Sequence, residues 1–190
     1  MRHLTVGRVL VAAFGLSLCC VNGNALVVRA AQGTAKGAPA APRLTFAFEL
    51  RATVAAPTEL GQVANGRRRI IDITGGVVEG PGLKGKVRPG GADWQIVRAD
   101  GFTELDTRYT IETDKGQLVY VQNPGMRHAP PDVMKKLLAG EAVDPALVYF
   151  RTQPKFETSA PELQWLTRSL FVGLGERYPS EVVIRFFRVE

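Results

Sequence analysis

Residues 105–122 read LDTRYTIETDKGQLVYVQ. In the first half, apolar side chains such as Leu105, Tyr109 and Ile111 alternate with polar ones, which is the period of two expected of a strand with one buried face. Gly116 supplies the positive φ that a tight turn requires. Alternation then resumes from residue 117 to residue 122. The stretch therefore predicts an antiparallel β-hairpin.

Alternation of this kind recurs at residues 44–51 and 182–189, and other short apolar or extended stretches lie between turns. Further strands are predicted at residues 44–51, 69–78, 83–87, 94–98, 147–152 and 182–189. Glycine and proline clusters separate them, as at turns. Many short strands with little helix indicate a sandwich or a barrel, and a barrel removes the exposed strand edges that favour aggregation.

One short helix interrupts the strands. It is predicted to begin at Pro130-Pro131-Asp132 and to end at Gly140, because proline is favoured in the first turn and glycine after the last. We expect this helix to lie in a loop excursion between strands, from residue 123 to residue 145. The excursion either covers a barrel mouth or forms a plain surface connection.

The N-terminus is predicted to be a signal peptide covering residues 1–25. Arg2 and Arg8 precede an apolar run at residues 9–21, which is shorter than the ~20 residues needed to span a bilayer. Small residues at 23–25 favour cleavage before Leu26. We therefore expect an exported protein, periplasmic or secreted, with no transmembrane span after cleavage. The alternative is an uncleaved membrane anchor.

Cys19 and Cys20 are the only two cysteines, and both lie in this leader. Leu18 is too large for the position before a lipid-modified cysteine, so we expect no lipid anchor. Residues 26–43 are predicted to be a flexible linker, since small residues, glycine and proline bury little apolar surface. Residues 44–190 then form a single domain without a disulfide, a thiolate metal site or a cysteine nucleophile.

The positive charge of the chain is concentrated before the domain. The net charge is +6, yet residues 44–190 hold 19 basic and 18 acidic residues. A nucleic-acid-binding domain normally carries its basic surplus on its own surface. We therefore expect no nucleic-acid partner, and we interpret the run at residues 67–69 as a solvated strand end.

Several motifs occur in one order along the domain. They are IDITGG at residues 71–76, PGGADW at 89–94, YFRT at 149–152, FET at 156–158 and WLTR at 165–168. Together they resemble the domain-of-unknown-function 3237 family, also called uncharacterised protein family 0311. The resemblance covers nearly all of residues 44–190 and implies an all-β, lipocalin-like barrel of antiparallel strands. It implies no established activity.

Candidate chemistry rests on carboxylates, because the domain holds one histidine, His128, and no cysteine. We expect no metal and no cofactor. The candidate acid–base residues are Asp93, Glu112 and Glu157. A carboxyl group such as that of Asp93, beside an indole in a semi-dry site, would have a raised pKa and exchange protons. Equally, Asp93 could accept backbone N–H groups in a turn.

Arginines and aromatic residues are the candidates for ligand binding. The set comprises Trp94, Arg108, Tyr109, Arg151, Thr152, Trp165 and Arg168. Arg108 and Glu112 share one strand face, which is either solvent-facing, the preferred interpretation, or lines a barrel lumen. Arg151 and Glu157 either form a buried structural pair or bind a ligand. Trp165 and Tyr109 either pack in the core or form the wall of a pocket.

Three functions remain open at this point. The first is an exported barrel that binds a small polar or aromatic molecule in its mouth. The second is a metal-independent lyase, isomerase or hydrolase that uses carboxylate acid–base residues. The third is a structural accessory domain without a ligand. A homo-oligomer is a further open alternative, and fold alone does not choose among these functions.

Overall fold

The computed structural model describes residues 39–190. The predicted signal peptide and the predicted linker up to residue 38 lie outside the described residues. Residues 40–190 form one compact unit. Within residues 39–190, no helix is both long enough and apolar enough to cross a membrane.

The described chain is almost entirely antiparallel strand. The strands are β1 (Leu44–Val54), β2 (Thr58–Val63), β3 (Gly66–Glu79), β4 (Gly85–Val87), β5 (Gly91–Val97), β6 (Thr103–Thr113), β7 (Leu118–His128), β8 (Tyr149–Thr152), β9 (Lys155–Glu157), β10 (Phe171–Arg177) and β11 (Glu181–Val189). Two short α-helices, α1 (Pro131–Leu138) and α2 (Gln164–Thr167), and 3-10 turns at Pro145–Leu147 and Pro161–Leu163 complete it.

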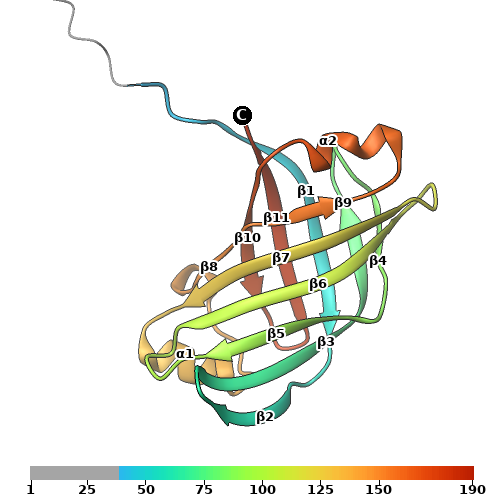
Figure 1. The fold of residues 1–190 in the computed structure, drawn as a ribbon. Helices are drawn as coiled ribbons and strands as arrows, with labels where there is room; N and C mark the ends of the chain where they lie inside the picture. The colour runs from blue at the N-terminus through green and yellow to red at the C-terminus, as the bar shows by residue number, and fades with distance from the viewer. Residues whose placement is uncertain (1–38) are drawn as a thin grey trace, which may run out of the picture. The chain divides into compact units, whose positions relative to one another are not determined.

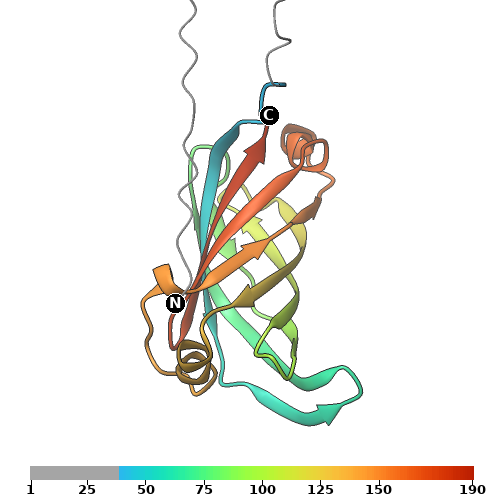
Figure 2. The same ribbon diagram turned by 90° about the vertical axis from the view of Figure 1, so that its left-hand side faces the viewer.

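Eight of these strands close into a barrel. Their order around the ring is β1, β3, β5, β6, β7, β8, β10 and β11, and β11 pairs again with β1. Figures 1 and 2 show the sheet curling round on itself. Strand β4 bridges β3 and β6, while β2 and β9 extend β3 and β7. The predicted all-β antiparallel barrel is confirmed.

The predicted hairpin is the longest pairing in the ring. Strands β6 and β7 pair from Thr103 opposite Arg127 to Glu112 opposite Leu118, and Gly116 in the turn has φ 76°. The prediction that the second strand ends at Gln122 was wrong, because β7 continues to His128. The loop excursion therefore begins after His128. Its predicted helix is confirmed as α1, with a proline in its first turn.

Strand β3 closes the ring because it changes partners along its length. Its first half, from Arg67 to Ile73, pairs with β5, and its second half, from Gly75 to Glu79, pairs with β1. A Cβ atom on Gly76 would lie 2.1 Å from the carbonyl oxygen of Arg51. Glycine is therefore required where β3 passes closely against β1.

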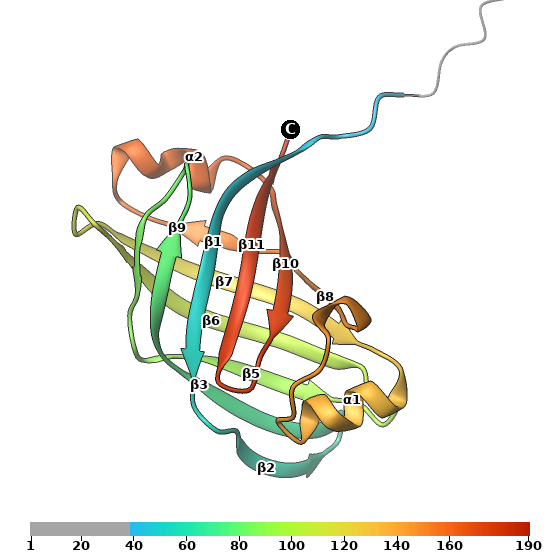
Figure 3. The same ribbon diagram turned by 180° about the vertical axis from the view of Figure 1, so that it is seen from behind.

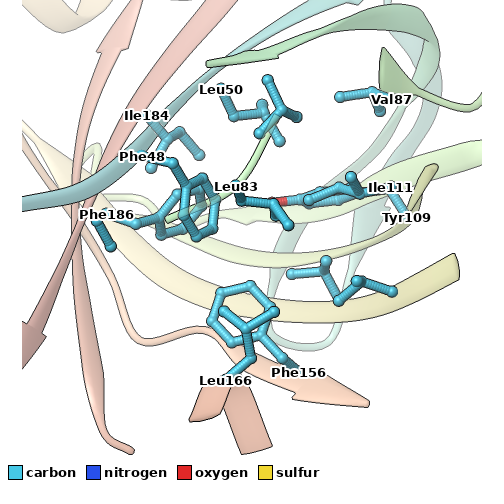
Figure 4. Close-up of a cluster of buried hydrophobic side chains, with 14 of the residues drawn as sticks. Phe48, Leu50, Leu83, Val87, Tyr109, Ile111, Phe156, Leu166, Ile184 and Phe186 are labelled. Atoms are coloured by element: carbon cyan, nitrogen blue, oxygen red, sulfur yellow. The ribbon is translucent and has the colours of Figure 1, made fainter. Parts of the chain in front are cut away.

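One end of the barrel is filled by aromatic and aliphatic side chains. The rings of Phe48 and Phe186 lie 4.8 Å apart, and those of Phe156 and Phe171 lie 5.1 Å apart. Leu166 of α2 is buried against this cluster and helps to close it (Figure 4). Each buried side chain of this kind contributes about 1.5–3 kcal/mol. We call this the α2 end.

The opposite end of the barrel is flanked by α1 and β2 (Figure 3). A Cβ atom on Gly101, in the β5–β6 turn, would lie 3.8 Å from Cβ of Met134, a buried residue of α1. The helix is therefore packed at this end. We call it the α1 end, and the polar interior of the barrel lies toward it.

Candidate ligand site inside the barrel

Polar side chains from five strands face the interior between the apolar cluster and the α1 end. They surround a cavity of about 40 Å³. The polar residues lining this cavity are Asp93 and Gln95 on β5, Thr107 and Tyr109 on β6, Arg127 on β7, Thr152 on β8 and Arg177 on β10. On β5 and on β6 the two polar residues are separated by one residue, so strand alternation turns both of them inward. We call this space the barrel cavity.

Apolar residues form the other side of the barrel cavity. They include Leu50 and Ala52 of β1, Ile73 of β3 and Ile184 of β11. A water needs about 10–15 Å³ of such volume, so the cavity has room for about three waters. The cavity is thus small and has one polar and one apolar side.

A chain of hydrogen bonds links half-buried Asp93, whose Oδ1 is fully buried, to buried Arg127 across the cavity wall. Nε2 of Gln95 donates to Oδ2 of Asp93 at 2.5 Å, and Nη2 of Arg127 donates to Oε1 of Gln95 at 3.5 Å. Burial raises the pKa of Asp93, against the opposing effects of its hydrogen bonds and of the charge on Arg127. Asp93 therefore holds a proton more readily than an ordinary aspartic acid.

Three arginines carry positive charge into this part of the barrel. Burial lowers the pKa of Arg127 to about 10; the attraction of Asp93 is the second-largest effect and opposes this change, and weaker repulsion from Arg177 and Arg69 adds to it. Burial is also the main cause that lowers the pKa of Arg69 and of Arg177. All three guanidinium groups carry their charge at neutral pH, because an arginine side chain is effectively always protonated in proteins.

The three arginines differ in the hydrogen bonds and ion pairs that their guanidinium groups make. Arg177 donates to the carbonyl oxygens of Glu181 and Pro179 at 3.4 and 3.0 Å. Nη1 of Arg69 lies 3.7 Å from Oε1 of Glu59 on the exposed strand β2, beyond hydrogen-bond distance. Arg127 is 3% exposed, and the centre of its guanidinium lies 5.7 Å from the ring centroid of Phe150. Arg69 therefore has a long ion pair with Glu59, whereas the charge of Arg127 has no carboxylate within ion-pair distance among the described residues.

Unsatisfied polar atoms concentrate at the barrel cavity. Within residues 39–190, buried side-chain atoms without a hydrogen-bond partner are Arg69 Nε and Nη1, Asp93 Oδ1, Tyr109 Oη, Asn123 Nδ2 and Oδ1, Arg127 Nε and Thr152 Oγ1. Four of these residues line the cavity, and Asn123 lies opposite Thr107 in the same wall. Folded proteins satisfy nearly all such groups, since each orphan costs about 1–3 kcal/mol.

Glycines on neighbouring strands hold part of the cavity wall in place. A Cβ atom on Gly175 would lie 2.5 Å from the ring of Phe150, and one on Gly173 would lie 2.1 Å from Oγ1 of Thr152. Gly125 leaves similar room on the other side of Thr152. The two inward side chains of β8, Phe150 and Thr152, therefore pack against glycine positions of the neighbouring strands, where there is no side chain.

Three of the residues proposed from the sequence line the barrel cavity, namely Asp93, Tyr109 and Thr152. Trp94 and Arg108 lie together in an open groove on the outer surface. Arg108 pairs there with Asp106 at 3.3 Å. The alternation that turns Tyr109 inward turns its neighbour Arg108 outward, so the alternative in which Arg108 lines the lumen does not hold.

The remaining proposed residues also lie away from the cavity. Glu112 pairs with Lys86 and Arg88 at 3.2 Å on the outer face of the sheet. Glu157 is exposed on β9, and Arg151 lies 4.8 Å from the centroid of the Tyr149 ring. The predicted ion pair between Arg151 and Glu157 is absent from the described part of the chain.

The two proposed residues at α2 belong to the opposite end of the barrel. Trp165 lies 5.7 Å from the ring of Phe171 and lines an open groove with Phe46 and Arg188. Arg168 is exposed after the end of α2. Neither side chain reaches the barrel cavity.

The sequence did not single out Gln95, Arg127 or Arg177, which line the cavity, nor Arg69. Arg127 was hidden because Pro124 and Gly125 interrupt the apolar pattern of β7. Arg127 lies two residues after Gly125 and four after Asn123, so strand alternation would have predicted that it continues the inward face of the strand.

Comparison with known proteins assigns the chain to a family. The sequence model described as "Protein of unknown function (DUF3237)" matches residues 42–189. The chain belongs to the DUF3237 family. A UPF0311 protein of Rhodopseudomonas palustris strain TIE-1 is 46% identical over 144 residues, which cover 76% of this chain and 94% of the relative.

Solved structures of DUF3237 relatives have the same barrel. A crystal structure of a conserved protein of unknown function from Rhodopseudomonas palustris has a TM-score of 0.78 and 44% identity, covering 80% of this chain and 99% of that one. A beta-barrel like protein from Acinetobacter baumannii AYE has a TM-score of 0.71 and 39% identity, covering 82% and 100%. The match spans nearly the whole length of both of those chains.

Proposed function

We propose that this DUF3237 barrel binds a small polar molecule in the barrel cavity, between Asp93, Tyr109, Arg127 and Thr152. The observation that supports this function is the group of buried polar atoms without partners around one cavity. Such atoms are costly unless something satisfies them. A ligand with several donor or acceptor groups would recover that cost when it binds.

The contrast between the two ends of the barrel argues against a purely structural domain. The α2 end is packed with phenylalanine, leucine and valine side chains. A domain that served only to hold a shape could be filled in the same way at the α1 end. Instead, strands β5 to β8 direct polar groups inward there.

A ligand screen by thermal denaturation tests this function on the purified barrel, residues 40–190. A molecule that binds only the folded state raises the apparent melting temperature. We expect hits among molecules of a few non-hydrogen atoms, and a smaller shift for Thr152→Val, which removes one inward hydroxyl without changing the side-chain volume much. A library in which no small polar molecule raises the melting temperature would count against binding.

Acid–base catalysis on the bound molecule is a second candidate function, and the surroundings of Asp93 support it. Its Oδ1 is buried without a partner at the cavity, and burial raises the pKa of the carboxyl group. Ionised Asp93 could take a proton from a carbon next to a carbonyl group, leaving the electron pair on an enolate oxygen near Arg127. Return of a solvent-exchanged proton would restore the molecule.

Deuterium exchange distinguishes catalysis from binding alone. In D₂O, the methyl protons of pyruvate, a small 2-oxo acid, would be replaced faster with the native barrel than with Asp93→Asn, as followed by proton NMR. Equal exchange with both proteins, together with retained binding, would leave the binding function and remove the catalytic one.

We further propose that the protein is exported. Support comes from the basic start, the short apolar run at residues 9–21 and the small residues before Leu26. Expression of the full chain with a C-terminal tag, followed by cell fractionation and mass spectrometry, tests this. We expect a chain that starts near Leu26 outside the cytoplasm, and an unprocessed cytoplasmic chain would contradict export.

A further inference from the structure

We infer that the molecule bound in the barrel cavity is a short-chain monocarboxylate, held by the guanidinium group of Arg127 and by the hydroxyl groups of Tyr109 and Thr152. The inference rests on the proposed binding function and names the chemical class of its ligand. It follows from the balance of charge, the kind of unpartnered atoms and the shape of the cavity.

Charge is the first argument. Arg69, Arg127 and Arg177 lie close enough to repel one another, and Asp93 is the one acid among the residues lining the cavity. Asp93 is linked to Arg127 by hydrogen bonds only through Gln95. Buried positive charge without a direct partner is costly. An anion would compensate it, a neutral ligand would not, and a cation would be repelled.

The unpartnered atoms are the second argument, because most of them are donors. Of the four unpartnered atoms on residues that line the cavity, Nε of Arg127 can only donate, the hydroxyl groups of Tyr109 and Thr152 can donate as well as accept, and only Oδ1 of Asp93 is an acceptor alone when ionised. A carboxylate offers two oxygens with about four acceptor positions and matches the planar fork of a guanidinium. The cavity therefore presents the complement of a carboxylate group.

The shape of the cavity limits the rest of the molecule. Its volume of about 40 Å³ corresponds to about three waters, which suits a carboxylate with a very short chain. Leu50, Ala52 and Ile184 line the side away from the arginines. A methyl or ethyl group attached to the carboxylate would face these apolar side chains, so acetate and propionate are the simplest probes.

Thermal denaturation and calorimetric titration of the purified barrel test the inference with matched probes. Acetate and propionate are compared with acetamide, which has the same shape without the charge, and with chloride at the same ionic strength. We expect a saturable rise in melting temperature with the two carboxylates and none with acetamide or chloride. Arg127→Met should weaken acetate binding at least tenfold, and Tyr109→Phe several-fold.

Arg51→Met is the matched control for the loss of an arginine. The Arg51 side chain is 47% exposed and pairs with Glu49 on the outer face of β1, so acetate binding should be unchanged. Circular dichroism and unfolding curves establish that the Arg127 and Tyr109 variants are folded, and Tyr109→Phe retains the charge and most of the volume. Weakened binding in folded variants supports the assignment.

The possible outcomes separate the ligand class from the binding function itself. Equal responses to acetate and acetamide would leave a binding site and overturn the carboxylate class. A response to chloride as strong as that to acetate would indicate a site for inorganic anions and would also overturn it. If none of these probes binds but another polar molecule in the wider screen does, the class is wrong and the function stands. If no molecule in that screen binds, both the carboxylate class and the binding function are contradicted.

Discussion

Replacement of Arg127 by methionine should stabilise the ligand-free barrel while weakening its ligand binding. Arg127 is 3% exposed, and burial is the main cause that lowers its pKa from the ordinary arginine value to about 10. At about 1.4 kcal/mol for each tenfold change in the acid dissociation constant, this difference means that the folded state pays roughly 3 kcal/mol to keep Arg127 charged at pH 7.

Methionine removes that charge but also removes two favourable contacts. The hydrogen bond to Gln95 at 3.5 Å is worth at most about 1 kcal/mol, and the interaction with the Phe150 ring at 5.7 Å about 0.5–1 kcal/mol. The free energy of unfolding should therefore rise by about 1–2 kcal/mol. For a protein of this size that corresponds to about 2–8 °C in melting temperature.

Urea denaturation at pH 7, in a buffer free of carboxylates, measures this change. Arg51→Met is the control, because an exposed ion pair contributes at most about 1 kcal/mol. The reasoning would be refuted if Arg127→Met were less stable than the native barrel under these conditions, since Arg127 would then have to be well compensated without a ligand.

The pH dependence of the same pair of proteins gives an independent check. The pKa of Arg127 is lower in the folded state than in the unfolded state, so above pH 10 the unfolded chain binds more protons at this site. The cost of its charge is fully present below pH 10 and is relieved as the pH rises from there toward the ordinary pKa of arginine. The stability advantage of Arg127→Met should therefore shrink above pH 10.

Further substitutions probe other parts of the account. Asp93→Asn should gain stability relative to the native barrel as the pH rises from 3.8 through the raised pKa of Asp93. Over this range the native carboxyl group must ionise in a poorly solvated site, and the amide of Asn does not ionise. Urea denaturation at a series of acidic pH values measures this, and parallel stability curves for the two proteins would contradict it. Arg108→Met, on the outer face, should leave the affinity for acetate within twofold of the native value in calorimetry. A large loss of affinity would indicate that acetate binds at the outer groove and not in the barrel cavity. Gly175→Ala places a methyl group 2.5 Å from the Phe150 ring and should cost about 1–3 kcal/mol by urea denaturation, whereas a neutral effect would show that β8 can shift.

Local alternation accounts for the part of the fold that the sequence predicted. The spacing of Leu105, Tyr109 and Ile111 identified β6 and its inward face correctly, because a strand with one buried face must alternate. The same rule places Arg108 and Glu112 outward. Arg108 and Glu112 were proposed as site residues because of their charge, although the alternation already placed them on the outer face.

The polar half of the cavity could not be predicted from local sequence patterns, because its residues come together only when distant strands pair to close the barrel. Arg69 and Arg127 come from β3 and β7, and Arg177 comes from β10. The run at residues 67–69 looked like a solvated strand end, yet the side chain of Arg67 is 42% exposed and that of Arg69 only 5%. Only the closed pairing of β3, β5, β6, β7, β8 and β10 shows that these charges meet.

Arginine side-chain NMR observes the contact on which the whole interpretation depends. In ¹⁵N–¹H spectra of the Nε–H groups, acetate should shift the Arg127 resonance along a saturable curve, and acetamide should leave it in place. The Arg51 resonance should not move with either probe. If the Arg127 resonance stays fixed in saturating acetate, or if all arginine resonances drift together, the barrel does not hold a carboxylate in its interior.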